Sequence, residues 1–472
     1  MSRKRLNKTE FNLNIIDINS KGMGVAKSKE GVVYFVKNVV PGDIVDIRIY
    51  KKRRGYFEGE PISWIKKSNQ RTIPVCEHFG ICGGCKWQHL SYKGQLDYKE
   101  KGIINNLRNI GKLDINEILP IRGVKNPFYY RNKMEFSFSN KRWLTSDEIN
   151  KDTNVDRNGL GFHKPGMWDK VVDINKCHLQ ADPSNEIRNA IRSYSIEKKF
   201  KFFDTHNQSG FLRTLMIRNT LDGEIMVLIQ FFKEDKIKRE LLLNYIKKSF
   251  PKIVSLLYCI NSKGNDSIYD QDIFCFKGKD HITEHIDDLQ FKITAKSFFQ
   301  TNPKQADILY GIAKNFASLE PNEIVYDLYT GTGTIALSLA KDCAKVIGIE
   351  SVKEAIDAAR ENAKFNQIKN VIFELGDMKY CFDDDFISRH GRADLVITDP
   401  PRNGMHADVV QQLLKLAPKK IVYVSCNSST QARDIKMMKN KYKVVKSQAV
   451  DMFPQTHHAE NVVLLHLNTN HA

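Results

Sequence analysis

The 472-residue chain lacks the features that define membrane, secreted and repeat proteins. No apolar run reaches the roughly 20 residues that a membrane-spanning helix needs. Residues 1–5 (MSRKR) are polar and basic, so they lack the apolar core of a secretion signal. Internal repeats and low-complexity tracts are also missing. We therefore expect a cytoplasmic protein without a membrane partner, and the length predicts two or three domains.

Negative charge is also in short supply. Asp and Glu together number 55 against 73 Lys and Arg, which gives a formal net charge of +18. A positive surplus of this size suits a polyanionic partner such as a nucleic acid. Composition alone leaves open a second interpretation, in which the host's proteins are generally rich in lysine.

Nine cysteines in a cytoplasmic protein are interpreted as ligands, nucleophiles or core residues before disulfides. Cys76, Cys82 and Cys85 lie close together, and a fourth, Cys177, stands far along the chain. Three neighbouring thiolates and one remote thiolate are a reasonable ligand set for a [4Fe–4S] cluster. Zinc held by the three cysteines and His89 is the alternative, and spacing alone leaves both open. Four further cysteines lie in or beside apolar segments and are expected to be structural: Cys259, Cys275, Cys343 and Cys381.

Polar residues follow apolar segments in the last quarter of the chain. Residues 399–404 (DPPRNG) follow the apolar run 393–398, and such a loop often presents polar groups to a planar base. Cys426 directly follows another apolar run, 421–424, which is a good place for a nucleophile. Further on, Glu460 offers a carboxylate for base work. A lone cysteine is usually buried and inert, but these polar neighbours favour a reactive one.

A thiol, an aspartate and a second carboxylate are what methylation at C5 of a pyrimidine requires. C5 of uracil is a weak nucleophile, and a thiolate that adds to C6 turns the ring into an enolate whose C5 can attack. The methylated adduct must then lose its C5 proton to a general base. Cys426 fits the first role and Glu460 the second. The target base should leave its stack to reach them.

A glycine-rich turn upstream indicates the methyl donor. Residues 323–328 predict a buried strand, 329–334 (YTGTGT) a turn, and the apolar residues that follow a helix. The next strand ends at Glu350, about twenty residues on, where a carboxylate can bind ribose hydroxyls. The turn has two of the three glycines of a dinucleotide fingerprint, which favours S-adenosyl-L-methionine over NAD. Asp377 follows a third apolar strand and is a candidate for contact with the adenine.

Three segments emerge along the chain. Residues 1–66 carry short, regularly spaced strands, which predict an OB-like β-barrel for RNA, with a basic tip at 51–54. Residues 67–288 mix strands and amphipathic helices and predict an α+β central domain with the cysteine site; within it, 143–158 is expected to be an exposed loop. Residues 289–472 alternate strand and helix, which predicts a Rossmann-like α/β domain.

Taken together, these motifs resemble those of the RNA uracil-C5 methyltransferases, and within that family the iron–sulfur enzymes that act on 23S rRNA. The resemblance covers nearly the whole chain. Residues 22–26 and 40–43 resemble the family's TRAM domain, a β-barrel for RNA, and residues 130–133 resemble its central-domain motif near the RNA. The resemblance also favours a cluster over zinc, with the family's four [4Fe–4S] ligands falling on Cys76, Cys82, Cys85 and Cys177.

The resemblance further implies the roles of single residues. Cys426 falls on the nucleophile and Glu460 on the base. Gln300, within 297–302, matches a glutamine of the active site, and residues 91–124 are expected to pack with the catalytic domain. The residues expected to contact the methyl donor or line the active site are Gln300, Tyr329, Glu350, Asp377 and Asp399. One departure is Ser428, where the family usually has a proline that would stiffen the turn.

The sequence thus predicts a monomeric RNA (uracil-C5)-methyltransferase that uses S-adenosyl-L-methionine. We expect 23S rRNA as the substrate, because bacterial relatives specific for tRNA typically lack both the barrel and the cysteine cluster. One alternative is the same reaction on tRNA. Another is a non-catalytic RNA-binding assembly factor, against which the intact set of Cys426, Asp399 and Glu460 argues.

Overall fold

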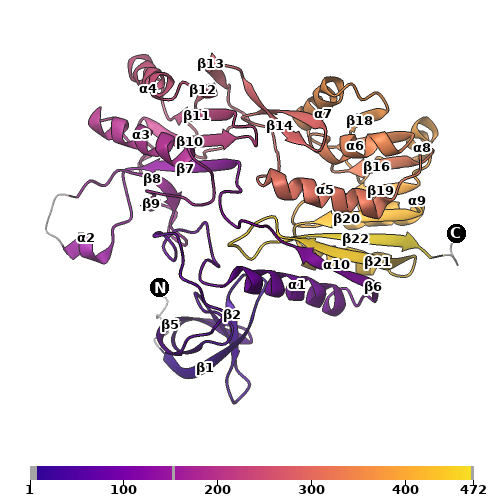
Figure 1. The fold of residues 1–472 in the computed structure, drawn as a ribbon, viewed down its shortest axis with the longest axis horizontal. Helices are drawn as coiled ribbons and strands as arrows, with labels where there is room; N and C mark the ends of the chain where they lie inside the picture. Colours follow the sequence, from indigo (N-terminus) through magenta and orange to yellow (C-terminus); the bar gives the residue numbers. More distant parts are fainter. Residues whose placement is uncertain (1–7, 151–154, 469–472) are drawn as a thin grey trace.

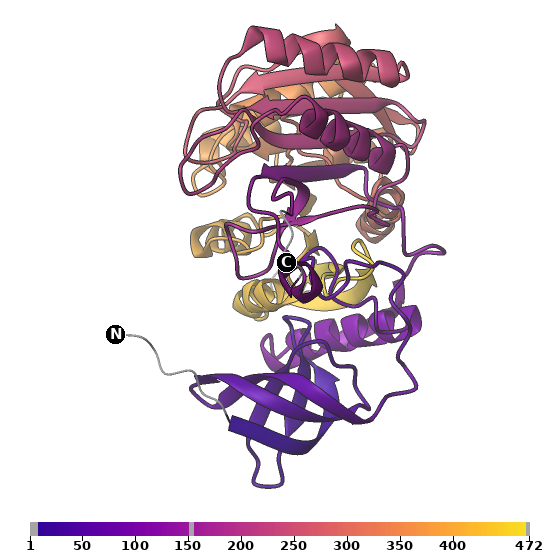
Figure 2. The ribbon, with the colours of Figure 1, turned by 90° about the vertical axis from the view of Figure 1, so that its left-hand side faces the viewer.

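The computed structural model describes residues 8–150 and 155–468. A small barrel lies at one end of the molecule, and two larger sheets with their helices lie beside one another beyond it (Figures 1 and 2). Within the described ranges, no helix is long and apolar enough to cross a membrane.

The N-terminal residues form a closed five-stranded barrel in the order β1-β2-β3-β5-β4. Its strands are β1 (Lys8–Ile18), β2 (Gly24–Lys27), β3 (Val33–Val36), β4 (Ile44–Arg53) and β5 (Tyr56–Lys66). Alternate residues such as Val45, Ile47 and Ile49 are buried inside, as the period of a strand requires. The expected small barrel is confirmed. β2 was not among the expected strands, because four residues are too few to show the alternation.

The central part is built on a seven-stranded sheet in the order β13-β12-β11-β10-β7-β8-β9. Its strands are β7 (Lys133–Ser139), β8 (Gly159–His163), β9 (Val171–Asp173), β10 (Leu212–Asn219), β11 (Ile225–Phe231), β12 (Ile253–Ile260) and β13 (Phe274–Gly278). The helices α3 (Ser184–Glu197) and α4 (Lys236–Ser249) bury Ile191 and Leu242 in the same apolar cluster as the sheet.

The central part contains one helix that the sequence indicates and one that it does not. α4 begins after Asp235, whose side chain accepts a hydrogen bond from the Lys238 N–H, so the expected helix is present. The expected loop 143–158 contains a short helix, α2 (Ser146–Asn150), which the polar sequence did not indicate. Residues 151–154 of that loop lie outside the described residues.

The C-terminal part is an eight-stranded sheet in the order β18-β17-β16-β19-β20-β22-β21-β6. Its later strands are β16 (Ile324–Leu328), β17 (Lys345–Glu350), β18 (Val371–Leu375), β19 (Leu395–Thr398), β20 (Lys420–Ser425), β21 (Tyr442–Val450) and β22 (Glu460–Leu467). β22 runs antiparallel to β20, whereas β16 to β20 are mutually parallel. This is the expected Rossmann-like methyltransferase fold.

Helices cover both faces of this sheet (Figure 1). One face packs against α5 (Pro303–Ala317), α6 (Thr334–Leu339) and α7 (Lys353–Phe365), together with the hairpin of β14 (His281–Ile286) and β15 (Leu289–Thr294). The other face packs against α1 (Tyr92–Asn109), α8 (Asp384–His390), α9 (Ala407–Leu416) and α10 (Ser428–Met438). A single 3₁₀ turn, η1 (Ala340–Asp342), follows α6.

The sheet contains one strand from far away in the sequence. β6 (Ile115–Arg122) pairs in parallel with β21, and α1 lies against α10. The chain therefore leaves the barrel, contributes α1 and β6 to the C-terminal sheet, and only then builds the central sheet.

Candidate active site

The candidate catalytic groups gather at one edge of the C-terminal sheet. Asp399 follows β19 and Cys426 follows β20, and because these strands are parallel, their carboxyl ends lie at the same edge. Glu460 begins β22, which runs the opposite way, so its first residue also lies at this edge. Ser425 pairs with Asn461 in this antiparallel pair of strands. The next residues beyond that pair, Cys426 and Glu460, therefore lie opposite one another.

Burial shapes the ionisation of these three groups. Burial first, and then the nearby Glu460 and Asp399 carboxylates, raise the pKa of the Cys426 thiol to about 11. Arg402 lies close enough to lower the pKa of the same thiol. Burial also raises the pKa of Asp399 to about 7 and that of Glu460 well above its usual range, with Asp399 adding to the latter. Two carboxyls with raised pKa values beside a thiol are typical of a catalytic site.

The turn that carries Cys426 is held by its neighbours. The Asn427 side chain caps α10 by accepting from the Ser429 N–H (3.1 Å) and donates to the Arg402 carbonyl (2.9 Å). Ser428, at the place of the family's usual proline, is the first residue of α10. Its hydroxyl accepts a hydrogen bond from the Asn106 side chain of α1 (2.8 Å). A contact to α1 therefore holds the turn in place although it lacks the proline.

Tyr310 is a further member of this group of side chains that the sequence did not indicate. It lies buried in α5, and its pKa is raised by burial first and then by Asp399 and Glu460. The Gln300 side chain acts in the opposite direction and lowers the pKa of the Tyr310 hydroxyl. A tyrosine inside an apolar helix has the sequence pattern of a core residue, so no motif could have identified it.

The central part reaches this site through one short segment. Asn132 donates twice to it, from its backbone N–H to the Thr301 carbonyl (2.8 Å) and from its side chain to the Gln300 carbonyl (3.1 Å). Tyr130 donates from its hydroxyl to the Pro454 carbonyl (3.1 Å). Residues 130–133, expected to lie near the RNA, therefore join the Gln300 segment to the loop that precedes Glu460.

The candidate methyl-donor turn has the expected form. Tyr329 and Gly331 adopt left-handed backbone conformations (φ 61° and 56°), and the Gly331 N–H donates to the Glu350 carboxylate (3.2 Å). No atom lies within 4 Å of the point where a Cβ of Gly331 would stand, so there is open space for a ligand beside the backbone. Asp377 follows β18 at the same edge and is exposed. These residues fit an adenosyl group.

The loop that precedes Glu460 is held in place by α1 and the cysteine loop. The backbone N–H groups of Lys86 and Trp87 both donate to the Gln455 carbonyl (2.8 and 3.0 Å). Lys99 of α1 donates to the Asp451 carboxylate (2.5 Å), and both side chains of this ion pair are fully buried. Gln455 lies five residues before Glu460, so these contacts position the candidate base.

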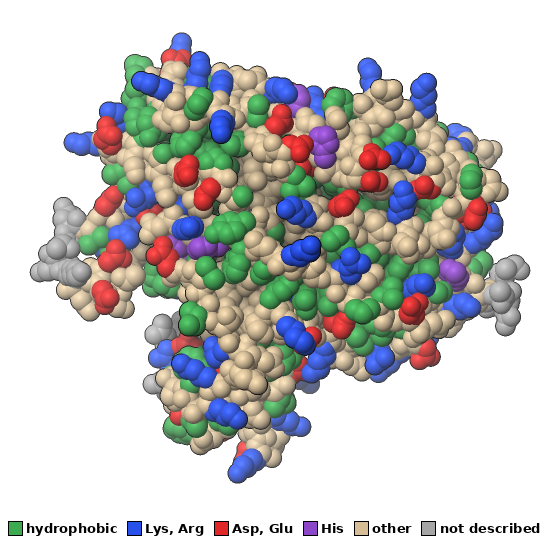
Figure 3. Space-filling model, in the orientation of Figure 1, with side chains coloured by type: hydrophobic (Ala, Val, Ile, Leu, Met, Phe, Trp, Pro, Cys, Tyr) green, Lys and Arg blue, Asp and Glu red, His purple; other side chains and the backbone are tan. Residues whose placement is uncertain are grey.

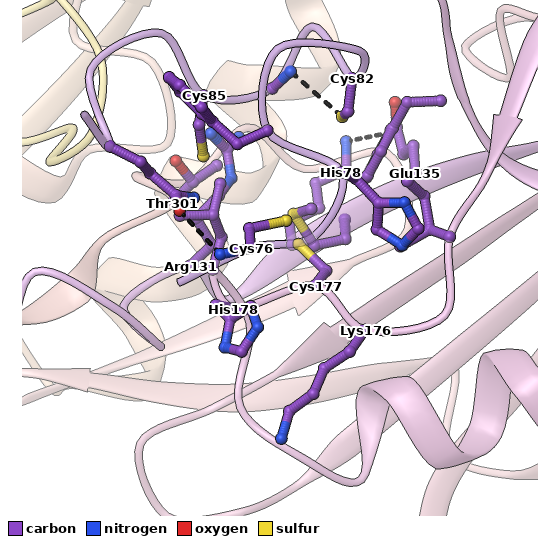
Figure 4. A pocket seen from close by; sticks show the side chains of 18 residues that line it. Cys76, His78, Cys82, Cys85, Arg131, Glu135, Lys176, Cys177, His178 and Thr301 are labelled. Atoms are coloured by element: carbon purple, nitrogen blue, oxygen red, sulfur yellow. Dashed lines mark hydrogen bonds and ion pairs between the residues drawn. The ribbon is translucent and has the colours of Figure 1, made fainter. Parts of the chain in front are cut away.

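The four candidate cluster cysteines line one cavity of about 370 Å³. Figure 4 shows the sulfurs of Cys76 and Cys177 pointing toward one another, with Cys82 and Cys85 on the same loop as Cys76. Burial first, and then the neighbouring thiols, raise the pKa of Cys82 to about 11 and that of Cys85 to about 12. In 8–150 and 155–468, no group of three or more His, Cys, Asp or Glu side chains is arranged to hold a metal ion.

His89, the expected fourth ligand of the zinc alternative, does not belong to this cavity. Its Nε2 atom lies 3.3 Å from the Val39 carbonyl, and its ring lines a different cavity near the barrel. The Cys₃His arrangement is therefore not formed. The remaining cysteines differ in burial, since Cys259 and Cys343 are buried whereas Cys275 is exposed. Packing therefore does not explain a structural role for Cys275.

The fold and the donor-binding turn define an S-adenosyl-L-methionine-dependent methyltransferase, and comparison with known families agrees. Residues 319–464 match a methyltransferase domain, residues 215–378 match the tRNA (uracil-5-)-methyltransferase family, and residues 4–62 match the TRAM domain.

Whole-chain relatives give the same result. The chain is 52% identical to an uncharacterized RNA methyltransferase of Bacteroides thetaiotaomicron, across 95% of this chain and 99% of the relative. It is 50% identical to one of Porphyromonas gingivalis, across 97% and 100%. Among solved structures, it is similar to the Pyrococcus abyssi tRNA (uracil-54, C5)-methyltransferase in complex with S-adenosyl-L-homocysteine. That match has a TM-score of 0.73 and 30% identity, and covers 96% and 99% of the two chains. The chain belongs to the RNA uracil-5-methyltransferase family that carries a TRAM domain.

Proposed function

We propose that the protein methylates C5 of a uridine in 23S rRNA through a covalent bond between Cys426 and C6 of the base. The observation that carries this proposal is the meeting of the Cys426 thiol with the Asp399 and Glu460 carboxyls at one sheet edge. A non-catalytic assembly factor would have no use for a buried carboxyl pair beside a thiol, because burying such groups costs stability.

The chain's own residues account for the chemistry. The Cys426 thiol gives its proton to solvent water, and its thiolate adds to C6, so that the C5–C6 π electrons move toward C5 and O4. S-adenosyl-L-methionine, when bound, supplies the methyl group that C5 takes. Glu460 then removes the C5 proton, the C5–C6 double bond forms again, and the thiolate leaves. Arg402 favours the thiolate, since it lowers the pKa of Cys426.

The residues for the methyl donor follow from the same edge. Glu350 would hold the ribose hydroxyls, and Asp377 the adenine. Tyr329 and Gly331 leave backbone space beside them, and Gln300 would approach from α5's N-terminal side together with Tyr310. The raised pKa of Glu460 suits a general base that works near neutral pH.

The choice of 23S rRNA rests on the resemblance to the iron–sulfur rRNA enzymes. A second substrate, tRNA, is favoured by one specific observation, the whole-chain similarity to an archaeal tRNA (uracil-54, C5)-methyltransferase. Purified protein, labelled S-adenosyl-L-methionine and unmodified transcripts separate the two. We expect label as 5-methyluridine in 23S rRNA fragments and none in tRNA. Label in tRNA alone would reverse the choice of substrate, and Cys426→Ala is the blank for both.

We further propose that Cys76, Cys82, Cys85 and Cys177 hold a [4Fe–4S] cluster. A zinc ion needs four donors that converge on one point, whereas a cluster needs four thiolates around a larger body. The four thiols line one cavity of about 370 Å³, which offers room for such a body. Two lining residues also have buried polar atoms without a partner in the described ranges, Arg131 (Nε) and Thr301 (Oγ1). Both are donors that can hydrogen bond to sulfide.

The cluster proposal predicts about four iron and four sulfide per chain and a brown colour in protein purified without oxygen. Cys85→Ala should lose the colour and most of the iron. Cys381→Ala is the matched control, because its sulfur lies outside the cavity, and it should keep both. A colourless preparation with one zinc per chain would contradict the proposal.

A further inference from the structure

A second cavity, of about 420 Å³, lies where the barrel meets the segment that leads into the cysteine loop. Trp64 of β5 forms one wall, and the other lining residues are Asn38, Phe79, His89 and members of the segment 67–74. Its volume is within the range of about 300–1,000 Å³ typical of sites for small ligands. The proposed chemistry at Cys426 does not use any of these residues.

The outer wall is a tryptophan with a fixed cation beside it. Arg71 donates from Nε and Nη2 to the two carboxylate oxygens of the fully buried Asp43 (2.8 and 2.6 Å). Asp43 is itself held by the N–H groups of Val40 and Ser68. The Arg71 guanidinium lies 5.5 Å from the centre of the Trp64 ring, which is 39% exposed. Since the bonds to Asp43 hold the guanidinium in place, Arg71 and Trp64 form a preformed surface.

The inner wall consists of two rings and an unused acceptor. The Phe79 and His89 ring centres are 5.2 Å apart. The Val39 carbonyl can only accept a hydrogen bond, so the His89 Nε2 atom beside it carries the proton and Nδ1 carries a lone pair. In the described part of the chain, this buried Nδ1 has no partner. Because the atom is enclosed, a planar ligand with an N–H group would satisfy it after the His89 ring turns toward the cavity.

The rim of the cavity is apolar and basic. Ile73, which lines the cavity, is 90% exposed, and the exposed Lys67 also lines it. Exposed apolar residues that gather with cations mark a binding surface. Lys and Arg side chains are spread over the face of the molecule in Figure 3, the barrel included. Aromatic platforms flanked by cations are how proteins bind unpaired bases and their phosphates.

We propose that this cavity binds one unpaired nucleotide of the substrate RNA, separate from the uridine that reacts at Cys426. The base stacks on Trp64 and donates to His89, and its phosphate faces Lys67. The proposal rests on RNA being the substrate, which the family provides, and not on which RNA it is. His89 is two residues from Trp87, whose ring lies 6.4 Å from that of His457, beside the loop that carries Glu460. The site would therefore hold the strand that flanks the target base.

The test measures binding of the full chain, without S-adenosyl-L-methionine, to fluorescein-labelled single-stranded RNA of about 12 nucleotides. Trp64→Ala should weaken binding about 5- to 150-fold, the loss expected for one stacked base. Phe11→Ala is the matched control, an aromatic residue of β1 in the same barrel that is 62% exposed and outside the cavity. It should bind like the unchanged protein.

A set of RNAs with one abasic nucleotide at each position in turn identifies the cause of the loss. For the nucleotide that occupies the cavity, the abasic RNA should bind the unchanged protein and Trp64→Ala equally. A loss that persists with every abasic RNA, or an equal effect of Phe11→Ala, would overturn the proposal. An unchanged affinity of Trp64→Ala would do so too and would point to a protein partner.

Lys67→Ala keeps the test decisive if Trp64→Ala fails to fold. Because Lys67 is proposed to meet one phosphate, the slope of log affinity against log salt should fall by about one. An unchanged slope would contradict the phosphate contact. Methyl transfer is not measured in either experiment, so their outcome is separate from that of the proposed reaction.

Discussion

At the scale of single residues, the proposed reaction requires that the Cys426 thiol becomes a thiolate. Burial raises the pKa of its thiol first, and the Glu460 and Asp399 carboxylates raise it further, whereas Arg402 lowers it. The free protein is therefore protected against loss of the thiol proton. Protonation of the carboxylates, or a bound base that separates them from the thiol, would lower the pKa of Cys426.

Removing one of these charges should shift the reactivity of Cys426 in a defined direction. Glu460→Gln removes a negative charge, so the thiol pKa falls, and each full unit gives about tenfold more thiolate at a fixed pH below the pKa. Alkylation of Cys426 by iodoacetamide, followed by mass spectrometry of its peptide, should reach its midpoint at lower pH than in the unchanged protein. Arg402→Met should move the midpoint to higher pH. Identical midpoints in all three proteins would contradict the coupling.

The meeting of three candidate residues at one place could be predicted from the sequence, whereas their chemical roles stay predictions. Asp399, Cys426 and Glu460 each begin or follow a strand, and the order of parallel strands brings such positions to one edge. Tyr310 and Asn132 could not be predicted, because their contacts join elements that are far apart in sequence. No periodicity or motif records a contact of that kind.

At the scale of secondary-structure elements, α1 holds the loop that carries the candidate base. Lys99 and Asp451 are separated by 352 positions, yet form a fully buried ion pair, with the Tyr92 hydroxyl also donating to Asp451 (2.8 Å). The strand order explains why the sequence gives no sign of it. β6 enters the sheet beside β21, so α1 is carried to the same end of the domain as the last loop.

Breaking this pair should destabilise the fold strongly. Lys99→Met leaves the Asp451 charge buried without a partner, which costs about 3–5 kcal/mol of unfolding free energy. The matched control is Lys93→Met on the same helix, whose partner Asp97 is exposed, so the loss should be at most about 1 kcal/mol. Urea denaturation followed by circular dichroism measures both. Equal midpoints for the two variants would show that the buried pair does not hold α1 in place.

The elements themselves were predicted unevenly, for physical reasons. Long apolar runs such as β16 and β19 are buried on both faces and were evident in the sequence. The four-residue β2 and the helix α2 were missed, because one is too short for a period and the other buries no side chain. The place of β6 followed from the family resemblance and not from its own sequence.

At the scale of the whole molecule, three parts with different chemistry meet around one sheet edge. The barrel supplies basic and aromatic surface, the cysteine loop contacts the loop before Glu460, and the C-terminal sheet carries the reacting groups. In the proposed mechanism Cys426 acts before the methyl transfer and Glu460 after it, so the two half-reactions should be separable by substitution.

The most direct test of the central claim is a denaturing gel of protein incubated with substrate RNA and labelled S-adenosyl-L-methionine. Glu460→Gln should form the bond to C6 and take up the methyl group, but lack the carboxylate that removes the C5 proton. We predict a slowly migrating, methylated protein–RNA band for Glu460→Gln and none for Cys426→Ala. Product at normal rates from Cys426→Ala, or free 5-methyluridine at unchanged rates from Glu460→Gln, would contradict the account.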